Sequence, residues 1–244
     1  MNNLSIVKKI IKFIKTPVGD RPVVLGISGG VDSAVVAYLA VLALGKNKVF
    51  GLIAPKSLKT GNEDVRLAKL VVDKLKIKYQ IVELKNIVNS IKKNSGLFVD
   101  KKSFGNLQSR LRMCLLYGKA NEIDGLVLGT GNKSEIMIGY FTKYGDGGTD
   151  ILPIGDLYKT QVWELAKHLK VPEEIINRPP TAGLWPGQTD ENELGISYEK
   201  LDKILIAIEK KKKLNEFDKK DMIKIKKYIS NTEHKRILPK ICYF

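Results

Sequence analysis

The feature that most constrains this chain is an apolar run that stops abruptly at glycines and serines and then resumes with a helical pattern. Val23–Ile27 is apolar and β-branched, residues 28–33 read SGGVDS, and Ser33–Leu44 shows helical apolar spacing. A sharp turn from a buried strand into a helix exposes backbone N–H groups at a helix end that carries partial positive charge. The segment therefore predicts an anion-binding turn at the end of a strand.

Similar apolar runs recur along the chain and alternate with helical patterns. This alternation is typical of an α/β fold in which parallel strands are joined by right-handed helical crossovers. Continuous apolar runs also indicate strands that are covered on both faces. We therefore expect a doubly wound, mostly parallel sheet with helices on both faces. The expected strands are Val23–Ile27, Lys48–Ala54, Tyr79–Leu84 and Gly125–Gly129, and the expected helices are Ser33–Leu44, Asn62–Leu75, Asn86–Lys93, Asn106–Asn121 and Lys159–Leu169.

Length and local patterning favour one domain over residues 1–244. Residues 1–20 predict an amphipathic helix that docks on this domain, and their lysines interrupt any signal-peptide core. The proline- and glycine-rich residues 176–196 predict a mobile loop. No apolar run approaches the roughly 18 residues of a membrane span, so no membrane partner is expected. The apolar face of the first helix comprises Leu4, Val7, Ile10, Ile11 and Ile14.

The net charge of +16 at pH 7 is compatible with a nucleic acid or with small phosphorylated ligands. Most of the cationic residues are lysines scattered along the chain, whereas dedicated base readers rely on arginine. Solvated helix faces explain such charge better than a nucleic-acid surface, so no nucleic-acid partner is expected. Cys114 and Cys242 lie far apart without a CxxC motif, which favours a reducing, cytoplasmic location and no zinc site.

The residues of the turn indicate which anion it binds. Gly29 and Gly30 allow a phosphate to approach the backbone, and Ser28 and Ser33 offer hydroxyl groups. Asp32 would repel a phosphate unless a divalent cation joined the two, so a metal–polyphosphate complex is indicated. The turn is neither a GxxxxGK[ST] loop nor a GxGxxG fingerprint. The alternative is an ordinary capped helix start.

The string SGGVDS resembles the PP-loop of the ATP pyrophosphatases, and three later segments identify one family among them. The block LGTGNKSEIMIGYFTKYGDGGTDILPIGDLYKTQ, the stretch PPTAGLWPGQTDENELGIS and the late HKR are similar to the NAD synthetase family, in the same order. The resemblance implies an adenine nucleotide alpha hydrolase-like fold. It also implies a C–N bond-forming ligase of NAD biosynthesis.

The resemblance further implies a role for particular residues. Asp32 and Glu135 would bind Mg²⁺, and Asp32 and Lys159 would be catalytic. As a contact for deamido-NAD, Arg112 remains an alternative to Arg110. Without the surrounding block, Glu135 would be interpreted as a surface glutamate on a helix. ATP is assigned to Gly26, Ile27, Ser28, Gly29, Gly30, Val31, Asp32, Ser33, Thr130, Lys159 and Thr181, and deamido-NAD to Arg110, Lys143, Asp150, His234 and Lys235.

The implied reaction amidates deamido-NAD with ammonia in two steps. The nicotinate carboxylate attacks the α-phosphorus of ATP to give an NAD-adenylate and pyrophosphate, and ammonia then releases NAD and AMP. We expect Pro179–Ile196 to close over the adenylate. Few residues precede the first strand, so no glutaminase domain is expected. Family resemblance implies a homodimer, for which the apolar face of Asn106–Asn121 is a candidate contact.

Two other functions remain open at this point. A tRNA-modifying PP-loop enzyme would suit the basic charge, but it usually needs a further RNA-binding domain or catalytic cysteines. A regulatory nucleotide-binding module without catalysis would be expected to lack Asp32 or Glu135, and both are present.

Overall fold

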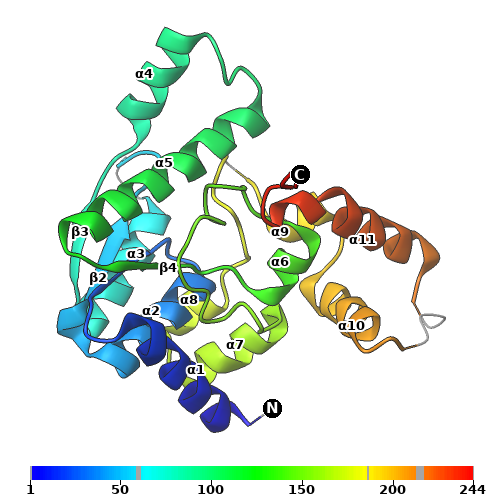
Figure 1. Cartoon of the computed structure of the whole chain (residues 1–244), viewed down its shortest axis with the longest axis horizontal. Helices are drawn as coiled ribbons and strands as arrows, with labels where there is room; N and C mark the ends of the chain where they lie inside the picture. The colour runs from blue at the N-terminus through cyan, green and yellow to red at the C-terminus, as the bar shows by residue number, and fades with distance from the viewer. Residues whose placement is uncertain (1, 59–61, 186, 213–216, 244) are drawn as a thin grey trace.

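The computed structural model describes residues 2–58, 62–185, 187–212 and 217–243 and has a parallel sheet at its centre (Figure 1). The strand order is β3-β2-β1-β4, so that β1 lies between β2 and β4, with Val23 opposite both Val49 and Leu126. This arrangement confirms the expected parallel α/β fold. The strands are β1 (Val23–Gly26), β2 (Val49–Ile53), β3 (Lys78–Ile81) and β4 (Leu126–Leu128).

The two faces of the sheet are covered by different helices because successive strand residues point to opposite sides. Val23 and Leu25 pack with α1, α2, α3 and α7 in the largest apolar core. Val24 and Val127 point the other way, toward Ala120 of α5. These helices are α1 (Asn3–Val18), α2 (Val31–Leu44), α3 (Glu63–Leu75), α5 (Lys101–Glu122) and α7 (Lys159–His168).

A second, smaller core lies beside the sheet, where α10 and α11 pack against α6 (Figure 1). Its buried side chains include Ile138 of α6, Tyr198 and Leu201 of α10, and Ile225 of α11. This core brings the late part of the chain next to the carboxyl edge of the sheet. The remaining elements are α4 (Lys85–Ser95), α6 (Lys133–Ile138), α8 (Glu173–Ile176), α9 (Asp190–Leu194), α10 (Tyr198–Glu209), α11 (Lys219–Asn231) and the 3₁₀ turns at Lys46–Lys48 and Glu233–Lys235.

Several sequence-based expectations need correction. Helix α5 begins at Lys101 rather than Asn106, because the Asp100 carboxylate accepts hydrogen bonds from the N–H groups of Lys102 and Ser103. Strand β3 is an exposed sheet edge rather than a strand covered on both faces. In the first helix Leu4 is exposed, and the buried side chains are Val7, Ile10, Ile14 and Val18.

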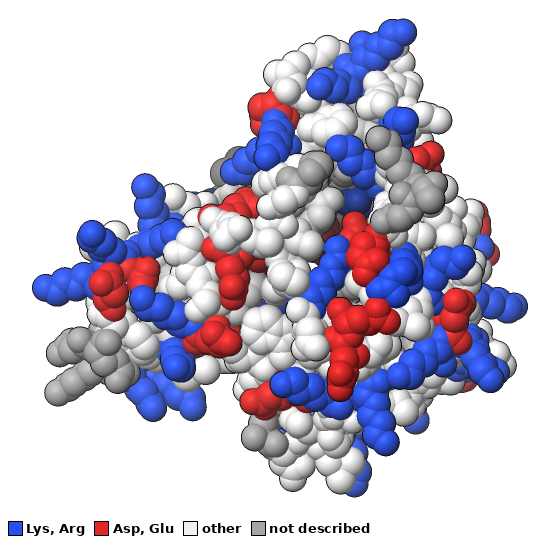
Figure 2. All heavy atoms as spheres, turned by 180° about the vertical axis from the view of Figure 1, so that it is seen from behind, with Lys and Arg blue, Asp and Glu red and all other residues white. Residues whose placement is uncertain are grey.

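The surface carries mixed charge. Figure 2 shows lysine and arginine side chains scattered over one face, with aspartate and glutamate side chains between them. Cys114 and Cys242 are both exposed. Among the described residues, none of the helices combines the length and the apolar character that a bilayer crossing requires.

Candidate active site

The glycine-rich turn follows β1 directly and leads into α2 at the carboxyl edge of the sheet. Gly29 has a φ of +81°, and a Cβ atom built there would lie 2.6 Å from the carbonyl oxygen of Asp64, so only glycine fits. The hydroxyl groups of Ser28 and Ser33 are hydrogen-bonded to each other at 3.0 Å. The N–H of Gly30 donates to Ser28 Oγ at 3.2 Å. The turn is therefore held in shape by its own serines.

Asp32, Glu135 and Lys159 meet beside this turn, although they come from the starts of three different helices. The Lys159 ammonium donates to Asp32 Oδ2 and lies 3.6 Å from Glu135 Oε1. The Lys159 side chain is 2% exposed, and the two carboxylate side chains are each 17% exposed. The structure thus places both expected metal ligands beside one buried cation. We call this cluster of Asp32, Glu135 and Lys159 the acidic triad.

Burial determines the charge state within the acidic triad. Desolvation, and then the nearby charge of Asp32, raise the pKa of Glu135 to about 8. Burial works against the Lys159 ammonium, but the charges of Asp32 and Glu135 outweigh it and raise the lysine pKa above its usual range. Lys159 is therefore a permanent cation in this pocket, and its ammonium lies 5.2 Å from the centre of the Tyr198 ring.

Asn132 belongs to this site, although sequence reasoning missed it. Its Nδ2 donates to Asp32 Oδ1 at 3.0 Å, and its Oδ1 accepts from the N–H of Glu135 at 3.0 Å. The Glu135 carboxylate accepts in return from the N–H of Asn132, which completes a capping box. The N-x-x-E spacing at the start of α6 was the sequence signal for this arrangement.

A second acidic group lies close to the acidic triad. The hydroxyls of Tyr198 and Tyr140 donate to the two carboxylate oxygens of Asp190, at 2.9 and 3.2 Å. The Tyr140 hydroxyl oxygen also lies 2.9 Å from Glu193 Oε2, so its single proton is shared between the two carboxylates. Burial raises the pKa of Asp190. These residues, which sequence reasoning also missed, tie α9 and α10 to the site.

Three of the five residues expected to bind deamido-NAD lie together. Lys143 Nζ donates to the backbone oxygen of His234 at 2.5 Å. Lys235 Nζ donates to the backbone oxygens of Gly139 and Phe141 at 2.7 and 2.6 Å, so part of its role is to cap the end of α6. This grouping joins the glycine-rich segment after α6 to the HKR segment.

The other two are Asp150, which hydrogen-bonds to β4, and Arg110 of α5. Asp150 accepts from the N–H of Val127 at 2.8 Å and from the Tyr117 hydroxyl at 2.9 Å. Arg110 is exposed on α5. Arg112 instead points inward and donates to the backbone oxygen of Ala54 at 2.9 Å, which ties α5 to the end of β2.

Thr130 and Thr181, both expected to contact ATP, lie on separate segments of the chain. Thr130 is half-buried between β4 and α6, and the Thr181 hydroxyl accepts from the N–H of Gly183 at 3.1 Å. Beyond Thr181, Leu184 packs against Gly105 of α5, and Lys101 lies 4.5 Å from the Trp185 ring. Pro186 of the expected mobile loop lies outside the described residues.

The donor set fits magnesium better than a metal that prefers nitrogen or sulfur ligands. In the described parts of the chain, His, Cys, Asp and Glu side chains do not gather in threes as a metal cage. Asp32 and Glu135 instead provide two hard oxygen donors beside a phosphate-type turn. Mg²⁺ is usually bound by one or two carboxylates together with phosphates and water.

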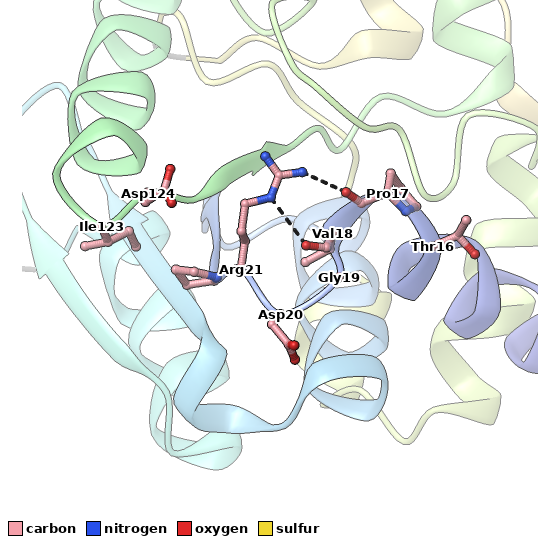
Figure 3. Close-up of a pocket in the computed structure, with 9 residues that line it drawn as sticks. Thr16, Pro17, Val18, Gly19, Asp20, Arg21, Ile123 and Asp124 are labelled. Carbon is pink, nitrogen blue, oxygen red and sulfur yellow. Dashed lines mark hydrogen bonds between the residues drawn. The ribbon is translucent and has the colours of Figure 1, made fainter.

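A separate open hollow lies at the opposite, amino-terminal edge of the sheet (Figure 3). It is lined by the end of α1 and by Ile123 and Asp124. Arg21, its central side chain, donates to the backbone oxygens of Pro17 and Val18 at 2.8 and 3.4 Å. This arginine satisfies the end of α1, and the hollow contains none of the site residues described above.

The fold and the turn define a PP-loop enzyme of the adenine nucleotide alpha hydrolase-like class, and the comparisons identify the family. Residues 6–239 match the family model described as NAD synthase. An NH(3)-dependent NAD(+) synthetase of Pyrococcus horikoshii is 50% identical, with 96% of this chain and 93% of the relative covered. The chain therefore belongs to the NAD synthase family.

Two solved structures share the fold over their whole length. An NMN synthetase from Francisella tularensis has a TM-score of 0.89 and 34% identity, with both chains fully covered. An NH3-dependent NAD synthetase from Campylobacter jejuni, in complex with a nitrate ion, has a TM-score of 0.86 and 33% identity, again with full coverage of both chains.

Proposed function

We propose that this chain amidates deamido-NAD with ammonia, using ATP and releasing NAD, AMP and pyrophosphate. The observation that carries the proposal is the acidic triad beside the glycine-rich turn, in a chain that belongs to the NAD synthase family. That geometry combines a backbone anion site, two hard carboxylates and a buried cation. These are the groups needed to hold a triphosphate and to stabilise charge that develops on it.

ATP would bind with its β- and γ-phosphates in the turn, against the N–H groups of residues 26–33. Thr130 and Thr181 would contact the rest of the nucleotide. Asp32 and Glu135 would hold Mg²⁺, which when bound neutralises phosphate charge and favours departure of pyrophosphate. The Lys159 ammonium contacts both carboxylates and would turn from them toward a phosphate oxygen when ATP binds.

The chemistry then needs positioning more than proton transfer. An oxygen of the nicotinate carboxylate forms a bond to the α-phosphorus, and the bond to the β-phosphate bridging oxygen breaks, so that pyrophosphate leaves with the electron pair. Lys159 would stabilise the growing negative charge on the phosphate oxygens. Ammonia then adds to the activated carbonyl carbon, loses a proton, and expels AMP to leave the amide.

Deamido-NAD would bind along Arg110, Lys143, Asp150, His234 and Lys235. Lys143 and Lys235 lie near one another and supply positive charge for its phosphates and carboxylate. We propose that a second copy of the chain completes this site, with α5 packing against α5 in a homodimer. We also propose that Pro179–Ile196 closes over the adenylate, and that the enzyme acts in the cytoplasm on free ammonia.

The proposed function is tested by measuring the ratio of the NAD and AMP that the protein forms. The purified protein is incubated with ATP, Mg²⁺, deamido-NAD and ammonium, and NAD and AMP are quantified together. Equal amounts of NAD and AMP are expected, and glutamine in place of ammonium should give neither. ATP consumption without NAD formation would contradict the proposal.

A second candidate is amidation of a mononucleotide rather than a dinucleotide. The similarity to the Francisella tularensis NMN synthetase supports it, whereas the higher identity to dinucleotide-forming relatives favours deamido-NAD. Competition between the two substrates at equal concentration would decide, and we expect NAD to be the main product.

A further inference from the structure

Asp202 is a buried carboxylate outside the site residues described so far. It lies on α10, one turn after Tyr198, and only 1% of the residue is exposed. A fully buried carboxylate costs free energy unless hydrogen bonds satisfy it. The hydrogen bonds to Asp202 come from α6 and α7, and each of these helices carries a member of the acidic triad.

The two oxygens of Asp202 reach different helix starts. Oδ1 accepts from the Ser134 hydroxyl at 2.5 Å, and Oδ2 accepts from the backbone N–H of Thr160 at 2.9 Å. Ser134 is the residue before Glu135 in α6, and Thr160 is the residue after Lys159 in α7. The carboxylate is therefore linked within one residue to both Glu135 and Lys159.

Ser134 closes the connection between the two helices. Its hydroxyl oxygen accepts from the backbone N–H of Lys159 at 2.9 Å while its proton is donated to Asp202. The first N–H groups of a helix have no partner within the helix, so these bonds fix where α7 begins. The negative charge of Asp202 also lies at the positive end of α7, where it is stabilised.

We propose that Asp202, acting through Ser134, is a positioning residue that sets the distance between Glu135 and Lys159 for phosphoryl chemistry. The inference rests on the proposed function, because it gives Asp202 the role of aligning the groups that carry out that reaction. Asp202 touches no reacting atom. It fixes the backbone from which the Lys159 and Glu135 side chains extend, and displacement of a catalytic group by about 1 Å can cost roughly 100-fold in rate.

The test compares three variants with a matched control. Asp202→Ala leaves the Ser134 hydroxyl and the Thr160 N–H without their acceptor, and Ser134→Ala breaks the same bridge at its other end. Asp202→Asn keeps an oxygen for Thr160 and an amide that can donate to Ser134. The control is Asp218→Ala, since the exposed Asp218 likewise accepts from two N–H groups at the start of α11.

We expect Asp202→Ala to lower kcat by roughly 10- to 100-fold, with KM for deamido-NAD within about twofold of wild type. Asp202→Asn should recover most of the rate, Ser134→Ala should resemble Asp202→Ala, and their double variant should be no slower than the worse single variant. Asp218→Ala should keep the wild-type kcat. If Asp202→Ala does not fold, Ser134→Ala carries the same test.

Amide hydrogen exchange over residues 157–165 gives a readout that does not depend on activity. Faster exchange at Lys159 and Thr160 is expected in Asp202→Ala and Ser134→Ala, with the later amides of α7 unchanged. Wild-type kcat in both of these variants, or an equal loss of kcat in Asp218→Ala, would overturn the inference. A wild-type protein that makes no NAD would instead overturn the proposed function. In that case, unchanged amide exchange in Asp202→Ala and Ser134→Ala would still contradict the hydrogen-bonded link from Asp202 through Ser134 to Lys159.

Discussion

Lys159 is the residue whose charge the site depends on most. Asp32 and Glu135 are largely buried on either side of it, and Asn132 gives only neutral hydrogen bonds to them. Burial and the charge of Asp32 both raise the pKa of Glu135, and the Lys159 ammonium offsets part of this cost of placing two carboxylates together. The same cation is the group expected to act on ATP, so stability and activity are linked at one side chain.

Removing this cation should therefore destabilise the protein. We expect Lys159→Met to lower the free energy of unfolding by about 3 kcal/mol, because it leaves buried charge uncompensated. Added Mg²⁺ should recover part of that loss. The control is Lys48→Met, which removes a pair with the exposed Asp20 and should cost less than about 1 kcal/mol. Denaturant unfolding with and without Mg²⁺ measures both, and equal losses in the two variants would contradict the prediction.

Gly29 allows a second comparison at the residue scale. Gly29 and Gly45 have nearly equal φ angles, +81° and +79°, but only at Gly29 would a Cβ atom collide with backbone. Gly45→Ala should cost about 1–3 kcal/mol from its backbone alone, because φ of +79° with ψ of +152° is a conformation that essentially only glycine adopts. Gly29→Ala should cost more and should also weaken ATP binding, since the turn must shift away from α3. Thermal unfolding and ATP titration check this, and similar results for the two variants would refute it.

At the scale of elements, patterning predicted the sheet well and the site less completely. The expected strands overlap β1 to β4. For β1, β2 and β4 the reason is that buried parallel strands leave continuous apolar runs, whereas β3 is an exposed edge strand. The early start of α5 was not expected, since Gly105 interrupts the helical pattern and the N-cap Asp100 lies well before the apolar positions that indicated the helix. Asp190 and Asp202 could not be found from the sequence, because their partners lie on other helices and local spacing carries no sign of them.

The segment Pro179–Ile196 is the element whose behaviour we expect to change on binding. It crosses between α3 and α5, where Arg178 pairs with Asp64 and Leu184 rests on Gly105. ATP together with deamido-NAD should protect it from limited proteolysis, because closure would bury its backbone. Cleavage near the exposed Leu97 and Val99 should not change and provides the internal control. Undiminished cutting within the segment would count against closure.

At the scale of the whole molecule, α5 presents an exposed stripe of residues one helical turn apart. Arg110, Cys114 and Gly118 are exposed along it, and small side chains at two of these positions would allow a second helix to approach closely. The double variant Cys114→Glu/Gly118→Glu should convert the proposed homodimer into monomers by placing like charges across the contact. Lys226→Glu on the exposed surface of α11 is the control. Sedimentation velocity distinguishes the forms, and a double variant that stays dimeric would exclude α5 as the contact.

The acidic triad also affects how the enzyme is made, because its members are far apart in the sequence. A ribosome that has translated only the first strands has produced the glycine-rich turn and Asp32, but not Lys159 or Asp202. Such a nascent chain contains the sequence of the turn but lacks the buried cation that contacts Asp32 in the folded protein. The complete site can therefore assemble only after Lys159 and Asp202 have been translated, late in the synthesis of the chain.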